Sequence, residues 1–68
     1  MKINVKLFTG EVSSRYVEVP DESTYFDLLL LLKINPETVV VFRDGVPVAF
    51  DAAVAGPKLE IVRVVSGG

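Results

Sequence analysis

The sequence predicts an α+β domain in which a mixed sheet of four to five strands packs on one helix. Three observations support this fold class. The 68 residues suffice for one small domain, because domains usually have ~50 to ~250 residues. Half of the residues are apolar, which excludes disorder and supplies a core. The periodicity changes along the chain in the order hairpin, helix, hairpin, strand, and a single amphipathic helix must bury its face against one side of a sheet.

The first element is a hairpin. Apolar and polar residues alternate over residues 2–9, which is typical of a half-buried strand. Gly10 and two serines indicate a turn over residues 9–14, and residues 15–19 form the returning strand. Pro20 ends that strand because proline cannot donate to the ladder.

The helix is predicted from about Tyr25 to Lys33. Thr24, followed three residues later by Asp27, fits a helix N-terminus with an acid at the positive end of the dipole. Lys33 is expected in the last turn, and Asn35-Pro36 stops the helix. At 100° per residue, the apolar face contains Tyr25, Leu28, Leu29 and Leu32, whereas Phe26, Leu30 and Leu31 lie off it.

The second half of the chain supplies the remaining strands. Residues 39–43 are a strongly β-forming run, and Asp44-Gly45 favours a type I′ hairpin turn into a return strand over residues 46–49, weakened by Pro47. Residues 50–57 form a small-residue loop, and residues 58–65 form the last strand. The first and last strands can pair in parallel at the centre of the sheet. The expected arrangement is a β-grasp roll over residues 1–65, followed by a flexible tail over residues 66–68.

Composition excludes several kinds of function. The chain has no Cys and no His, so it lacks a thiolate nucleophile, the commonest general base and the commonest metal ligand. We therefore expect no enzyme, no catalytic residue, no metal site and no bound cofactor. With seven Lys and Arg against nine Asp and Glu, no basic block predicts nucleic-acid binding. The longest apolar run, residues 28–32, is far short of a bilayer span, so we expect no membrane contact. A core without disulfides suits a reducing cytoplasm, where we expect the chain to be a monomer.

The reactive group is expected at the end of the sequence, Gly67-Gly68. Glycine lets a backbone pass through a narrow channel in which any Cβ would clash. The α-carboxylate of Gly68 is ionised at neutral pH, because its ordinary pKa is about 3.3–3.7. It is therefore inert to nucleophiles until it is activated, for example as an acyl-adenylate.

Three segments carry a resemblance to a known family: residues 24–29 (TYFDLL), 39–48 (VVVFRDGVPV) and 59–68 (LEIVRVVSGG). In this order they resemble the ubiquitin-like sulfur carriers and modifiers of prokaryotes. That group includes the small archaeal modifier proteins, the thiamine-biosynthesis sulfur carrier and the small subunit of molybdopterin synthase. The resemblance covers nearly the whole chain and is strongest to the short archaeal modifiers that also act in tRNA thiolation.

The resemblance implies a mechanism for the tail. A partner enzyme of the ubiquitin-activating type would use ATP to adenylate Gly68, with Gly67 as part of the motif. The acyl-adenylate would then become a thiocarboxylate, through a sulfur donor, or an isopeptide with a lysine of a target protein. Which of these occurs, and whether the end product is thiamine, molybdopterin or thiolated tRNA, stays open. Two alternatives remain: a small subunit of a molybdopterin-synthase-type enzyme, and an inert ubiquitin-like interaction module.

A second expected site lies on the sheet face that points away from the helix. Strand alternation places Ile3, Val5, Leu7, Val41, Leu59 and Ile61 inward. It places Phe8, Phe42, Val62 and Val64 outward, as a partner-binding patch. If the alternation were shifted by one residue, the inward and outward sets of side chains would be exchanged. The lysines at positions 2, 6, 33 and 58 are interpreted as solvated surface charges, with modification as the alternative.

Overall fold

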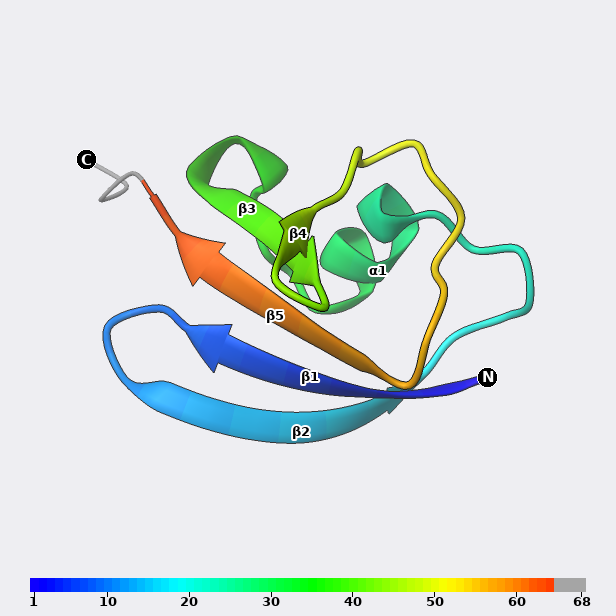
Figure 1. The fold of residues 1–68 in the computed structure, drawn as a ribbon, viewed down its shortest axis with the longest axis horizontal. Helices are drawn as coiled ribbons and strands as arrows, with labels where there is room; N and C mark the ends of the chain where they lie inside the picture. Colours follow the sequence, from blue (N-terminus) through cyan, green and yellow to red (C-terminus); the bar gives the residue numbers. More distant parts are fainter. Residues whose placement is uncertain (65–68) are drawn as a thin grey trace.

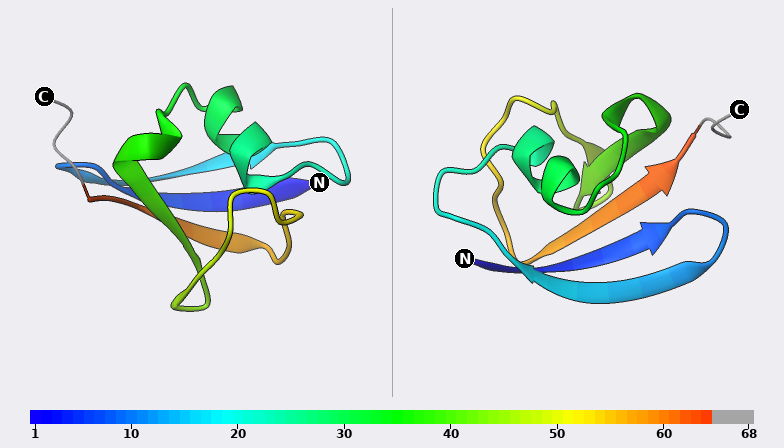
Figure 2. Two further views of the ribbon diagram at one scale, coloured as in Figure 1. Left: turned by 90° about the horizontal axis from the view of Figure 1, so that it is seen from above. Right: turned by 180° about the vertical axis from the view of Figure 1, so that it is seen from behind.

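The computed structural model describes residues 1–64 and places one helix on one face of a five-stranded sheet (Figures 1 and 2). The strands are β1 (Lys2–Phe8), β2 (Val12–Glu18), β3 (Val39–Arg43), β4 (Val46–Pro47) and β5 (Lys58–Arg63). The helices are α1 (Tyr25–Leu31) and the short 3-10 helix η1 (Pro36–Thr38). This architecture confirms the predicted β-grasp roll.

The strand order is β2-β1-β5-β3-β4, with β1 and β5 parallel at the centre, as predicted. The other neighbouring pairs are antiparallel, so the sheet is mixed. β5 is therefore held by hydrogen bonds on both sides, to β1 and to β3. The strand that leads into the C-terminal residues is the middle strand of the sheet.

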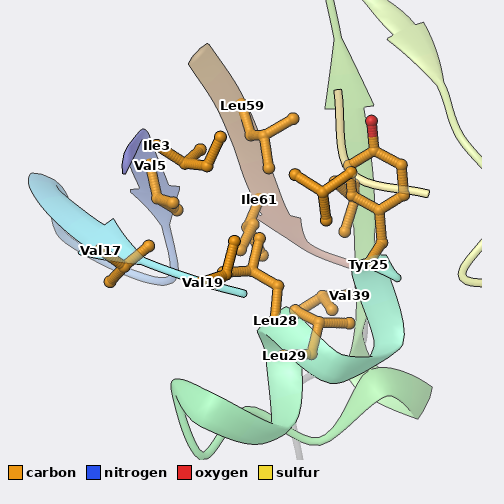
Figure 3. Close-up of a cluster of buried hydrophobic side chains, with 12 residues drawn as sticks. Ile3, Val5, Val17, Val19, Tyr25, Leu28, Leu29, Val39, Leu59 and Ile61 are labelled. Carbon is orange, nitrogen blue, oxygen red and sulfur yellow. The ribbon is translucent and has the colours of Figure 1, made fainter. Parts of the chain in front are cut away.

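The core forms between the helix and the inner face of the sheet (Figure 3). The helix contributes Tyr25, Leu28 and Leu29, each at most 1% exposed. The hydroxyl of Tyr25 accepts a hydrogen bond from the backbone N–H of Ala55 at 3.3 Å, so its polar end is satisfied. The sheet and the loops supply Ile3, Val5, Val17, Val19, Val39, Val41, Val54, Leu59 and Ile61. The predicted inward parity is thus confirmed, with Leu7 partly buried against the cluster.

The helix begins where the sequence predicts it. Thr24 Oγ1 accepts from the backbone N–H of Asp27 at 3.1 Å, and Asp27 Oδ2 accepts from the backbone N–H of Thr24 at 3.0 Å. These two bonds form a capping box, which satisfies two of the free N–H groups of the first turn. No helix within residues 1–64 is long and apolar enough to cross a bilayer.

The helix ends earlier than predicted. Leu32 is the C-cap, and Lys33 follows in the left-handed region with φ of 60°, so its expected position in the last turn is wrong. Lys33 N–H donates to the Leu30 carbonyl at 3.1 Å, and Ile34 N–H donates to the Leu29 carbonyl at 2.9 Å. This pair of bonds is a Schellman motif, in which glycine usually occupies the position that Lys33 has here.

Several other boundaries also differ from the predictions. β2 begins at Val12 and not at residue 15, because the hairpin turn needs only residues 9–11. The return strand β4 has two residues instead of the predicted four, and one further hydrogen bond to β3 follows it, from the Val48 N–H to the Val41 carbonyl at 3.0 Å. The turn itself is confirmed, with positive φ at Asp44 (53°) and Gly45 (77°). The predicted end of the domain at residue 65 and the tail over residues 66–68 lie outside the described residues.

Candidate functional site

The two glycines predicted to be reactive, Gly67 and Gly68, lie outside the described residues. The structure does place the strand that precedes them. β5 ends at Arg63, and the backbone N–H of Val64 donates to the Thr38 carbonyl at 2.9 Å. The backbone is therefore fixed four residues before Gly68.

The predicted patch does lie on the sheet face away from the helix. Phe8, Phe42 and Val62 are half-buried, and Val64 is 57% exposed. The parallel register of β1 and β5 brings Phe8 next to Val62. Phe42 on β3 pairs with Glu60, which is two residues before Val62 on β5. Phe8, Phe42 and Val62 alternate with the buried residues of their own strands and so point to the other face of the sheet, and Val64 directly follows β5.

Two residues of this surface were missed from the sequence. Val12 is 63% exposed and pairs with Phe8, and half-buried Val40 pairs with Val62. Val12 was placed in a turn, so its parity was not considered. Val40 could have been found by counting back from inward-facing Val41. We call the complete surface the outer patch: Phe8, Val12, Val40, Phe42, Val62 and Val64.

Polar and charged side chains border the outer patch. Lys6 Nζ lies 5.5 Å from the centre of the Phe8 ring, and Lys2 Nζ lies 5.7 Å from the centre of the Tyr16 ring. A shallow hollow of about 450 Å³ adjoins Phe42 and is lined by both signs of charge, including Lys58, Asp44 and Glu60. An apolar centre with a polar border is typical of a protein–protein interface.

The described part of the chain does not bring together three His, Cys, Asp or Glu side chains as a candidate metal site. The side chains of Lys2, Lys6, Lys33 and Lys58 are all exposed, as expected for solvated charges.

Comparisons with known proteins agree with this geometry. Residues 1–65 match the family model of small archaeal modifier protein 2. A protein of that name from Haloferax volcanii is 34% identical over 68 residues, and an uncharacterised protein of Archaeoglobus fulgidus is 41% identical; both alignments cover all of each chain.

Two solved structures from Caldiarchaeum subterraneum share the fold. One is described as a ubiquitin-like protein, with a TM-score of 0.64 and 22% identity over 98% of this chain and 100% of that one. The other is described as a ubiquitin, with a TM-score of 0.67 and 20% identity over all of both chains. At these identities the likeness establishes the ubiquitin-like fold.

Proposed function

Because this chain belongs to the small archaeal modifier protein 2 family, we propose that a partner enzyme activates its Gly68 carboxylate for transfer to other molecules. The chain is a ubiquitin-like modifier, and such proteins are generally not enzymes themselves. The family implies an activating enzyme and target proteins.

The activating step uses ATP bound by the partner. A carboxylate oxygen of Gly68 attacks the α-phosphorus of ATP, and pyrophosphate leaves with the electron pair of the broken P–O bond. The resulting acyl-adenylate has a good leaving group on its carbonyl carbon. A lysine amine of a target then attacks this carbon, loses a proton and expels AMP, which gives an isopeptide. Hydrosulfide attacks the same carbon, loses a proton and expels AMP, which gives a thiocarboxylate. A protein persulfide instead expels AMP to form an acyl disulfide, and a thiol must then attack its S–S bond, becoming part of a new disulfide, to release the thiocarboxylate.

One observation carries the proposal: the sequence places Gly67-Gly68 after β5, the central strand of a ubiquitin-like sheet, with three residues between the end of β5 and Gly67. β5 cannot move without breaking hydrogen bonds to both β1 and β3, so the domain is a rigid base for the residues that follow. The outer patch includes Val64, four residues before Gly68. We propose that the activating enzyme holds this patch while its active site receives the diglycine.

The test is ATP–pyrophosphate exchange with the activating enzyme of the source cell. Deletion of Gly68 should abolish exchange, and Gly67→Val should impair it, because a β-branched side chain cannot follow glycine through a tight channel. Both variants should keep the melting temperature of the parent chain, since the core and the strand pairs that hold β5 are built from residues 1–64. Normal exchange in the deletion variant would refute the proposal.

A further inference from the structure

A second surface lies on the helix side of the sheet, at the end where β5 stops. An open hollow of about 430 Å³ is located there, between the end of the helix and the sheet. Its apolar floor consists of Leu7, Leu32 and Ile34, which pack against the core. Arg15, Lys33 and Arg63 surround the floor, and Thr9, Asn35 and Thr38 complete the lining. We call this surface the basic groove.

The charge of the basic groove is opposite to that of the molecule. The chain has a formal net charge of −2, yet three of its seven Lys and Arg residues line one hollow, and no acidic side chain within residues 1–64 does. Glu11 and Glu37 are near in sequence but do not line it. Within residues 1–64, none of the three cations has a carboxylate within 4.0 Å. Grouped cations without a counter-charge attract an anionic partner.

The three cations come from separate elements with fixed backbones. Arg15 pairs with buried Val5, so its side chain starts on the helix side of β2. Arg63 pairs with buried Val39 and has the same parity on β5. In Figures 1 and 2, the β1–β2 turn, η1 and the end of β5 lie at the same end of the molecule.

Lys33 adds an independent observation. Its φ of 60° is the left-handed conformation that costs a non-glycine residue roughly 1–2 kcal/mol. Glycine would satisfy the same two capping hydrogen bonds without this strain. Backbone strain of this kind is a reason to look for a function of the side chain. Here the side chain lines the basic groove.

We propose that the basic groove binds an acidic segment, carrying leucine-type side chains, of the enzyme that activates the tail. The cations attract the carboxylates of this segment, and its leucine-type side chains pack on the apolar floor. Exposed ion pairs are individually weak, so several carboxylates and an apolar anchor must act together. A nucleic acid fits less well, because its phosphates would leave the floor uncovered and the rest of the chain is net acidic. The choice of the activating enzyme as the partner rests on the proposed function. Arg63 lines the groove and directly precedes residues 64–68, which end in the glycine that this enzyme would activate.

The groove itself is tested without any enzyme. The ¹⁵N-labelled chain is titrated with a synthetic peptide, Glu-Leu-Asp-Leu-Glu, and with its uncharged counterpart, Gln-Leu-Asn-Leu-Gln. The acidic peptide should shift the amide resonances of Leu7, Lys33 and Ile34 in a saturable way. Binding should fall as ionic strength rises toward about 1 M, where charges are screened within roughly 3 Å. No saturable binding, or equal binding of both peptides, would overturn the proposal.

Substitutions then assign the binding to the groove. Arg15→Gln, Lys33→Gly and Arg63→Gln should each weaken the acidic peptide by about 2- to 5-fold, as expected for exposed charge pairs. Matched controls are Lys2→Gln, Lys6→Gln and Lys58→Gln, which remove the same charge from the outer face and should leave binding unchanged. Lys33→Gly removes the cation and relieves the strain, so a loss of binding in a variant that melts no lower than the parent chain is due to the lost charge. Equal losses in both sets would overturn the proposal.

The partner is tested by pyrophosphate exchange with the three groove substitutions combined. The KM for the modifier should rise at least about tenfold while kcat stays the same, because the groove contributes to binding and not to chemistry. An unchanged KM would overturn the assignment to the activating enzyme. If the parent chain supports no exchange but binds the acidic peptide, the proposed function fails and the groove remains. If exchange is normal but the peptide does not bind, the groove fails and the proposed function remains.

Discussion

Lys33 occupies a backbone conformation that favours glycine, and its substitution should stabilise the domain. Lys33→Gly removes strain of roughly 1–2 kcal/mol, offset by the greater entropy of glycine in the unfolded chain. We expect a net gain of about 0.5–1 kcal/mol, seen as a rise of several degrees in melting temperature. Lys33→Ala removes the same charge but keeps the left-handed strain, so it should not melt higher than the parent. A destabilised Lys33→Gly would show that the side chain itself supports the fold.

Substitutions of Phe42 and Val62 test whether single residues of the outer patch bind the activating enzyme. Interface anchors often cost about 2 kcal/mol or more of binding when truncated. Phe42→Ala and Val62→Ala should therefore weaken binding of the activating enzyme, measured by calorimetry, more than they lower the free energy of unfolding. Val46→Ala is the matched control, because Val46 is 60% exposed and pairs with Arg43, on the opposite parity. A loss of several kcal/mol of stability in either patch variant would mean that the residue serves the core.

Helix α1 shows how sharply a single element divides between core and solvent. Leu29 is fully buried, whereas the next residue, Leu30, is 55% exposed. Leu29→Ala should cost about 2–5 kcal/mol, the usual range for a buried leucine, and Leu30→Ala should stay within about 0.5 kcal/mol. Chemical denaturation of the two variants measures both values. Similar losses for the two would contradict the packing described for the helix.

The start of this helix could be predicted from sequence, and its end could not. Thr24 and Asp27 form a capping box through their own side chains, so the signal is local. At the other end there is no glycine to mark the Schellman motif, and Lys33 suggested a helix that is two residues longer than the observed one. Helix η1 was missed because Asn35-Pro36 signals only a stop, although Asn35 Oδ1 also accepts from the Glu37 N–H at 3.0 Å.

At the scale of the whole molecule, the topology and the strand parity followed from the sequence. Period-two alternation in β1 and β5 fixes which side chains enter the core, and the wrong register would expose all of them. The outer patch was therefore predicted in part. The basic groove was not, because its cations come from positions 15, 33 and 63 and meet only through the tertiary fold.

Conjugation should leave a defined trace on target proteins. Arg63 is the last basic residue, so trypsin would leave residues 64–68 (VVSGG) attached to each modified lysine. Proteomics of the source organism, with and without sulfur limitation, should find this branch on several unrelated proteins. Its absence, together with a readily detected terminal thiocarboxylate, would leave sulfur transfer and remove protein modification.

The parallel pairing of β1 and β5 also sets how the domain responds to mechanical force. The N-terminus and the end of β5 lie at opposite ends of the molecule (Figure 1). A pull along this direction slides β1 against β5, so five registered residue pairs, from Asn4–Lys58 to Phe8–Val62, resist together. An antiparallel pair pulled from one end would instead open one bond at a time, like a zipper. A load applied between the N-terminus and the end of β5 is therefore shared by all five pairs at once, so the domain should unfold at a higher force than it would if these strands separated bond by bond.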